Sequence, residues 1–180
     1  MRRKNEIIYD YAEFSGIPIT DLIQQINQFH QLINQEWHAI ESNNWNEITR
    51  QFYAHSEHYV LDLLCSNPDR MEIERKLEEY QVWQFFSQLN KKLDILEFGG
   101  GLGGTCQLFH EKGHRATYLD IPGKPMKFAK WRYAKYDLDI SIIESNPEKL
   151  VLEHKYDFIF SDAVFEHLIN PEQVANELML

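Results

Sequence analysis

The sequence predicts an α/β protein in which a doubly wound, mostly parallel sheet follows a helical N-terminal region. From Lys92 onward, short apolar segments alternate with segments of helical pattern, which is typical of parallel strands joined by right-handed crossovers. A glycine-rich turn separates the first apolar segment from the next helical one. The residues before it carry helical patterns and little strand signal. We therefore expect residues 1–90 to form a helical cap or lid and residues 91–180 to form the sheet domain.

The N-terminal region shows its helical character most clearly between residues 19 and 37. Apolar side chains recur there at every third or fourth position, at Leu22, Ile26, Phe29, Ile33 and Trp37. Residues 46–64 and 70–89 repeat the pattern, and a turn around Pro68 separates them. The three segments are predicted to be helical.

The second region is predicted to contain four strands. The expected strands cover residues 92–98, 115–120, 139–143 and 156–162. The expected helices cover residues 103–112, 124–136 and 171–180. Pro125 suits the first turn of the second helix, and Asn170 with Pro171 suits the cap and first position of the third. Residues 147–152 are expected to form a short helix or a loop.

Composition excludes several classes of protein. The net charge of −10 over 180 residues argues against a general nucleic-acid binder, which would present a basic face. No apolar run reaches membrane-spanning length, and the start of the chain lacks the apolar core of a signal peptide. The cysteines, Cys65 and Cys106, suggest no disulfide framework. We expect a cytoplasmic protein with no membrane or nucleic-acid partner.

A zinc-protease signature occurs at His110, Glu111 and His114, which spell H-E-x-x-H. That motif binds zinc only on a continuous helix, where both histidines share one face. Gly113 interrupts it here, and glycine is favoured just past a helix end. We therefore expect a helix C-terminus at this point and no metal site.

The glycine-rich turn "LEFGGGLGGTC" is the predicted ligand site, because glycines between a strand and a helix let the backbone approach a ligand. Gly99, Gly101 and Gly104 satisfy G-x-G-x-x-G, the dinucleotide pattern. Gly99, Gly101 and Gly103 satisfy G-x-G-x-G, which suits an adenosyl ligand without phosphates. Asp120, at the end of the second strand, can accept hydrogen bonds from a ribose diol in either case.

Three features favour the adenosyl ligand. Glu97 precedes the first glycine, where a carboxylate would repel a pyrophosphate but could hold an ammonium group. About 90 residues of helical pattern precede the first strand, whereas many dinucleotide domains begin near the chain start. The third feature is the segment "YDFIFSDAVFEHLINPEQV", which contains the fourth strand.

These segments together resemble the class I S-adenosylmethionine-dependent methyltransferases. "ILEFGGGLGG" resembles the first motif of that family, "ATYLDIPG" its ribose-binding second motif, and "YDFIFSDAVFEHLINPEQV" its strand-four segment. The resemblance covers roughly residues 55–180. It implies a Rossmann-like doubly wound sheet, S-adenosylmethionine as cofactor and transfer of a methyl group to an acceptor.

The resemblance also implies roles for individual residues. The methionine end of the cofactor would be lined by Glu97, Gly99, Gly101 and Gly103. Asp120 would bind the ribose hydroxyls, Ile121 would pack on the adenine, and Ser145 and Asn146 would lie near the adenine amine. The family often has Asp at the last of these places, and this chain departs from that pattern.

Asp162, the last of the predicted cofactor residues, would flank the methyl-transfer region at the end of the fourth strand. His167 is the nearest candidate for a catalytic base. Tyr53, His55 and Tyr59, from the helical cap, are the expected lid and substrate residues. The acidic balance of the chain favours a small-molecule acceptor.

Two other functions remain open at this point. The same glycines permit a nicotinamide-dependent (NAD(P)) oxidoreductase, and a non-catalytic module that binds the adenosyl cofactor is a further alternative. The family sheet has seven strands and only four are found here, which would leave the fourth strand as a bare apolar edge. We therefore expect a fragment of a longer protein; the alternatives are that another chain, such as a second copy in a dimer, or the N-terminal helices cover this edge.

Overall fold

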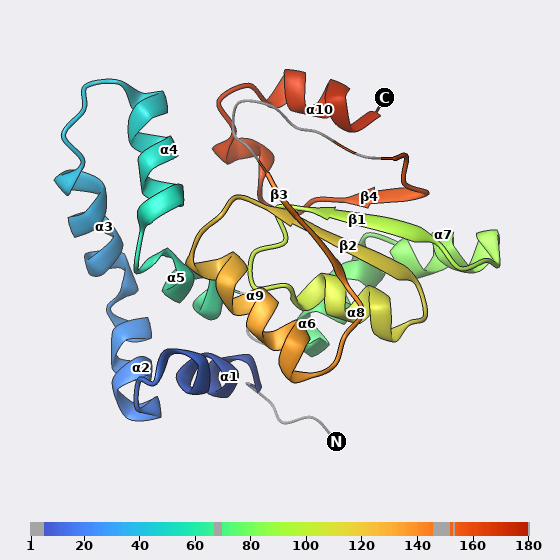
Figure 1. The fold of residues 1–180 in the computed structure, drawn as a ribbon, viewed down its shortest axis with the longest axis horizontal. Coiled ribbons are helices and arrows are strands. Elements are labelled where there is room, and N and C mark those ends of the chain that lie inside the picture. The colour runs from blue at the N-terminus through green and yellow to red at the C-terminus, as the bar shows by residue number, and fades with distance from the viewer. Residues whose placement is uncertain (1–5, 67–69, 146–151, 153, 180) are drawn as a thin grey trace.

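The computed structural model describes residues 6–66, 70–145, 152 and 154–179. Its centre is a parallel sheet whose strands are β1 (Asp94–Phe98), β2 (Arg115–Asp120), β3 (Ser141–Glu144) and β4 (Phe158–Phe160). The strand order is β3-β2-β1-β4, and each neighbouring pair is parallel (Figure 1). The predicted α/β fold with a parallel sheet is confirmed. All four carboxyl ends meet at one edge, which is where open α/β sheets bind ligands.

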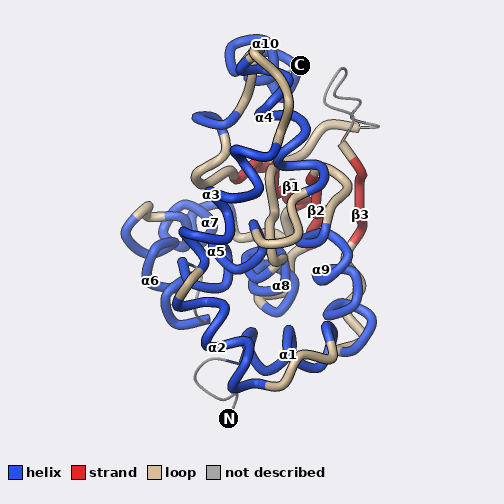
Figure 2. Tube along the Cα trace, turned by 90° about the vertical axis from the view of Figure 1, so that its left-hand side faces the viewer, coloured by secondary structure: helices blue, strands red, loops and turns tan. Residues whose placement is uncertain are grey.

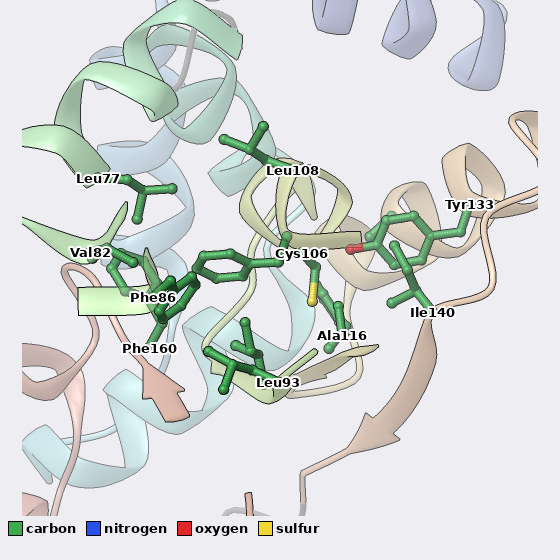
Figure 3. Close-up of a cluster of buried hydrophobic side chains, with 14 of the residues drawn as sticks. Leu77, Val82, Phe86, Leu93, Cys106, Leu108, Ala116, Tyr133, Ile140 and Phe160 are labelled. Atoms are coloured by element: carbon green, nitrogen blue, oxygen red, sulfur yellow. The ribbon is translucent and has the colours of Figure 1, made fainter. Parts of the chain in front are cut away.

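Helices cover both faces of this sheet. The helices α8 (Gly104–Glu111) and α9 (Lys124–Lys135) follow β1 and β2, and α10 (Pro171–Met179) follows β4 through a short 3₁₀ helix, η1 (Phe165–His167). Alternate strand residues separate two cores. Ile95 and Tyr118 face α8 and α9, whereas Leu96 and Leu119 face α10. The first core also contains Phe86, Cys106 and Phe109 (Figure 3 labels the first two).

The N-terminal region is helical, as predicted, but its helices are shorter than the predicted segments. They are α1 (Glu6–Ser15), α2 (Ile19–Asn27), α3 (Phe29–Ala39), α4 (Trp45–His55), α5 (Tyr59–Ser66), α6 (Arg70–Glu79) and α7 (Val82–Leu89). Each of the three predicted segments contains two helices. The breaks lie at Gln28, near Ser56 and at Gln81, which adopts a left-handed conformation with φ 58°.

These helices pack on the sheet domain in two places. Leu77, Val82 and Phe86, from α6 and α7, belong to the same core as the strand residue Ile95. The helices α1, α2 and α5 form another core with Phe128 of α9 and Leu102 of the glycine-rich turn. Figure 2 shows α1 and α2 at the end of the molecule opposite α10, with α4 close to α10.

A buried ion network fixes α1 against α9. Asp10 and Arg132 are both almost fully buried, and the Arg132 Nε donates to the Asp10 Oδ2 at 3.2 Å. The other Asp10 oxygen accepts from Lys135 Nζ at 2.8 Å and Tyr136 Oη at 2.7 Å. Arg132 also donates to the carbonyl of Leu102 at 3.2 Å. The network therefore joins α1 and α9 to the glycine-rich turn.

Among the residues that the structure describes, no helix combines the length and the apolar character needed to cross a membrane.

Candidate functional site

A cavity of about 1040 Å³ lies at the carboxyl ends of the strands. Its walls come from three parts of the chain that are far apart in sequence. The glycine-rich turn and the ends of β1 and β2 form one wall, α4 and α5 form the second, and residues 162–174 contribute to the third. The cavity thus lies between the sheet and the N-terminal helices.

The glycine-rich turn presents its backbone to this cavity. Gly99 and Gly101 both line it, and both have positive φ angles, of 76° and 52°. A Cβ atom added to Gly101 would meet only the Leu63 side chain, at 3.7 Å, so it would project into the cavity. The absence of a side chain at Gly101 therefore leaves room for a ligand close to the backbone.

Gly103 has a different reason to be glycine. It caps α8 with φ 75° and is not among the residues that line the cavity. A Cβ atom there would lie 2.3 Å from the Tyr133 hydroxyl, which donates to the Gly103 carbonyl at 3.0 Å. Gly103 thus permits close packing of the turn on α9, and the expectation that it lines the methionine end of the cofactor finds no support in its position.

We expect Gly103→Ala to destabilise the protein by about 3 kcal/mol, combining left-handed strain with overpacking against Tyr133. Gly113→Ala is the matched control, because Gly113 has φ 93° and an added Cβ would meet nothing within 4 Å. The control variant should lose only about 1 kcal/mol, from backbone strain alone. Urea unfolding followed by circular dichroism measures both, and equal losses would show that contact with Tyr133 is unimportant.

Asp120 ends β2 and holds the glycine-rich turn in place. Its Oδ2 accepts from the Gly101 amide at 2.7 Å, and its Oδ1 accepts from the Ile121 amide at 2.7 Å. Burial raises the pKa of this carboxyl, while these two hydrogen bonds favour its ionised form. A carboxylate offers about four lone-pair positions. A third donor, the Tyr118 hydroxyl, lies 3.3 Å from Oδ2, so the carboxylate keeps about one acceptor position for a ligand in the cavity that it lines.

Glu97 lies deeper, opposite the N-terminus of α8. It is 6% exposed, lines the cavity, and accepts a hydrogen bond from the Cys106 amide at 2.8 Å through Oε2. Burial raises the pKa of Glu97 to about 7, although hydrogen bonds from Thr105 and Cys106 oppose this rise. A cation placed beside Glu97 would favour its ionised form. The position therefore suits a positively charged ligand group rather than a phosphate.

Three of the remaining predicted cofactor residues line the cavity, and the fourth lies outside the described residues. Ile121 and Ser145 line the same cavity, and the Ser145 amide donates to the Asp120 carbonyl at 2.7 Å. Asn146 lies outside the described residues. Asp162 lines the cavity too, but its carboxylate is paired with Lys76 Nζ at 3.1 Å and accepts from Tyr80 Oη at 3.4 Å.

The structure brings all four predicted acceptor-side residues to the cavity, where Tyr53, His55, Tyr59 and His167 form part of the wall. The Tyr53 hydroxyl lies 2.9 Å from Nδ1 of His167, so a hydrogen bond joins α4 to η1. The rings of Tyr53 and Tyr59 pack edge to face with centroids 4.9 Å apart. Burial raises the pKa of Tyr53 to about 12 and raises that of Tyr59 further, so both phenols are neutral near pH 7.

The H-E-x-x-H residues do not converge. The helix α8 ends at Glu111, which pairs with Arg70, and His114 lies beyond Gly113. Nδ1 of His114 accepts a hydrogen bond from the Leu93 amide at 3.2 Å, and its ring packs on Phe86. The predicted helix end is therefore present. Within the described ranges, no group of three or more His, Cys, Asp or Glu side chains is arranged to hold a metal ion.

Comparison with known proteins agrees with this geometry. Residues 96–179 match the family model described as "Methyltransferase domain". The crystal structure of the plantazolicin methyltransferase BamL, in complex with a triazolic desmethylPZN analog and SAH, has the same fold with a TM-score of 0.57. It is 21% identical, over 84% of this chain and 55% of that one. Residues 96–179 thus match a methyltransferase-domain model, and the chain shares its fold with a methyltransferase structure.

Other solved structures are more distantly similar to this chain. The PH0226 protein from Pyrococcus horikoshii OT3 is 20% identical over 58% of this chain, with a TM-score of 0.46. The CcbJ methyltransferase from Streptomyces caelestis is 20% identical over 54% of it, with a TM-score of 0.41. The chain spans about half the length of such structures, covering 49% of the former and 43% of the latter. No curated protein matches the sequence.

Sequence reasoning identified Tyr59 but missed the other cavity residues that α5 and α6 supply. Asp62, Leu63 and Ser66 line the cavity with Tyr59, and Lys76 approaches Asp162 from α6. The four α5 residues lie at positions i, i+3, i+4 and i+7, which share one helix face. Val60, Leu61 and Leu64, on the opposite face, are buried in the core with α1 and α2. The sequence of α5 therefore contained the pattern that predicts one face buried in the core and the other facing a cavity.

Proposed function

We propose that this chain is an S-adenosylmethionine-dependent methyltransferase that acts on a small-molecule acceptor. The observation that carries the proposal is the pair of carboxylates beside one glycine-rich turn. Glu97 and Asp120 both line the same cavity, from the ends of neighbouring parallel strands. Their positions support a role for Glu97 in binding a cation and for Asp120 in binding a ribose diol.

The residues present fit this cofactor. Glu97 would hold the methionine ammonium group, because its buried carboxylate gains most from a nearby cation. Asp120 would accept from the ribose diol at its remaining acceptor position. Ile121 would pack on the adenine, and the open space at Gly101 would admit the ligand next to the backbone. BamL, the similar fold, is a methyltransferase that was crystallised with SAH.

The protein's task in this reaction is mainly one of positioning. S-adenosylmethionine, when bound, supplies a methyl group that its sulfonium already activates. The helices α4 and α5 would exclude water and orient the acceptor within the cavity, which lowers the barrier to in-line transfer. His167 would accept a proton from the acceptor at its ring nitrogen. Tyr53 would orient that ring through the 2.9 Å hydrogen bond.

A nicotinamide-dependent oxidoreductase fits the site less well. Its pyrophosphate would bind at the glycine-rich turn, beside Glu97 and Asp120, and the structure places both carboxylates at the cavity wall there. Among the described lining residues, the lysine and arginine side chains are Arg50 and Lys76, and each is paired with an acid. Tight binding of NADH would favour this alternative. Binding of S-adenosylhomocysteine without turnover on any acceptor would favour a non-catalytic module.

We expect Tyr53→Phe and Tyr59→Phe to affect turnover more than cofactor affinity. Tyr53→Phe removes the hydrogen bond to His167, which is worth about 1 kcal/mol, so kcat should fall about 5- to 10-fold. Affinity for S-adenosylhomocysteine should change less than about 3-fold, because neither hydroxyl hydrogen-bonds the glycine-rich turn.

The readouts for these two variants are initial rates of methyl transfer to an acceptor found by screening, and calorimetric titration with S-adenosylhomocysteine. Tyr9→Phe is the control, since Tyr9 is 53% exposed on α1. Unchanged kinetics for both cavity variants would remove the lid role of these tyrosines.

A further inference from the structure

The cavity face of α5 carries a carboxylate that the cofactor site does not use. Asp62 lines the cavity together with Tyr59, Leu63 and Ser66. Among the described residues, no side chain forms a hydrogen bond or ion pair with the Asp62 carboxylate. Burial raises the pKa of Asp62, while the charges of His30 and His167 only partly oppose this effect. Asp62 would therefore be stabilised by a cation in the cavity.

Each lysine and arginine described in the cavity wall already pairs with an acidic side chain. Arg50 pairs with Glu47 on α4, and Lys76 pairs with Asp162 at 3.1 Å. Glu177, from α10, accepts from the side-chain amide of Gln173 at 2.9 Å. The cavity wall therefore has an excess of negative charge, to which Asp62 contributes without a lysine or arginine partner among the described residues.

The rings of Tyr53 and Tyr59 line the same cavity as the Asp62 carboxylate. The charge of Asp62 contributes to the raised pKa of both Tyr53 and Tyr59, and the charge of Asp120 contributes to that of Tyr59. Tyr59 lines the same cavity as the predicted ribose carboxylate and Asp62. Neutral aromatic faces attract cations, especially where water is excluded. The carboxylate of Asp62 and the rings of Tyr53, Tyr59 and His167 line one part of the cavity wall. This part of the wall suits an ammonium group and disfavours an anion.

We propose that Asp62 binds an ammonium group of the methyl acceptor, so that the acceptor belongs to the class of cationic amines. The inference rests on the proposed function, because it takes the glycine-rich turn as the cofactor site and assigns the rest of the cavity to the acceptor. The negative wall selects amines over carboxylates and phosphates by charge, and over neutral alcohols by the charge-assisted hydrogen bond to Asp62.

A matched pair of probes tests this assignment. Phenethylamine and phenethyl alcohol have the same aromatic body and differ in the charged group. With the chain saturated by S-adenosylhomocysteine, the amine should bind at least about tenfold more tightly than the alcohol in a calorimetric titration. Asp62→Asn should bring the two affinities within about threefold of each other, since it removes the charge and keeps the shape.

Two further variants separate charge from packing. Asp62→Glu should keep the preference for the amine. Ser66→Ala, on the same face of α5, should also keep it, because the Ser66 hydroxyl donates to the Asp62 backbone carbonyl and not to its carboxylate. Retained preference in Asp62→Asn would overturn the proposal.

Other outcomes are equally decisive. Equal affinity of the original chain for the two probes, or no measurable binding of the amine, would contradict an ammonium site. If Asp62→Asn instead weakens S-adenosylhomocysteine by about tenfold or more, Asp62 serves the cofactor and the proposal is wrong. Failure of the original chain to bind S-adenosylhomocysteine at all would defeat the proposed function itself, and so the two failures are distinguishable.

Discussion

Asp120→Ala should reduce the affinity for S-adenosylhomocysteine by about 100-fold. The variant loses the acceptor for the ribose diol, and one hydrogen bond to a charged group is worth about 1.5–3 kcal/mol. It also frees the Gly101 amide, which the Asp120 carboxylate now holds at 2.7 Å, so the glycine-rich turn loses part of its preorganisation. Both effects weaken binding at the same place. Calorimetric titration of the folded variant measures the change.

Asp120→Asn and Glu144→Ala are the matched controls. Asparagine keeps one oxygen that can accept from the turn but loses the charge. The affinity of Asp120→Asn should therefore fall between those of the original chain and Asp120→Ala. Glu144 is the register neighbour of Asp120 on β3 and pairs with Lys130 in solvent, outside the cavity wall. Glu144→Ala should bind normally. A normal affinity in Asp120→Ala would show that this carboxylate does not contact the ligand.

Asp10→Ala should lower the free energy of unfolding by about 3–5 kcal/mol, the usual cost of breaking a buried ion pair from one side. The guanidinium of Arg132 is 6% exposed and would lose its carboxylate partner. Its remaining partners are the Leu102 carbonyl and the side-chain oxygen of Gln107, at 3.2 and 2.9 Å, and both are neutral. The glycine-rich turn is part of this network, so its geometry should loosen as well.

Glu13→Ala provides the comparison for this prediction. Glu13 also pairs with Lys135, at 2.7 Å, but its side chain is 63% exposed. An exposed ion pair contributes about 0–1 kcal/mol, so this variant should unfold close to the original chain. Urea denaturation of the two variants side by side measures the difference. A loss of less than about 1 kcal/mol in Asp10→Ala would mean that water reaches Arg132 and replaces the carboxylate.

The glycine-rich turn and Asp120 could be predicted from sequence because their positions are fixed locally. Strand ends, glycines and the first turn of a helix follow one another within a few residues, and the parallel arrangement then places neighbouring strand ends at one edge. Glu97 and Asp120 reach the same cavity for this reason. Gly103 shows the limit of this reasoning, because contact with Tyr133, a residue of α9, determines its environment.

The helix breaks could not be predicted because tertiary contacts determine them. The apolar stripe passes through the break at Gln28 without a proline or glycine to mark it. At the turn between α4 and α5, the carboxylate of Glu36 accepts from the Ser56 hydroxyl, and from the Glu57 and His58 amides at 3.1 and 3.3 Å. This contact spans about twenty residues of sequence and stabilises the turn that precedes α5. Asp62 lines the cavity from the helix that follows this turn.

The most direct test of the central claim is a calorimetric titration of this chain with S-adenosylhomocysteine, run in parallel with NADH. The proposed function predicts saturable binding of S-adenosylhomocysteine with a dissociation constant on the order of micromolar, or about −8 kcal/mol, and no measurable binding of NADH. Saturable binding of NADH, or a folded chain that binds neither ligand, would contradict the assignment of the glycine-rich turn to an adenosyl cofactor.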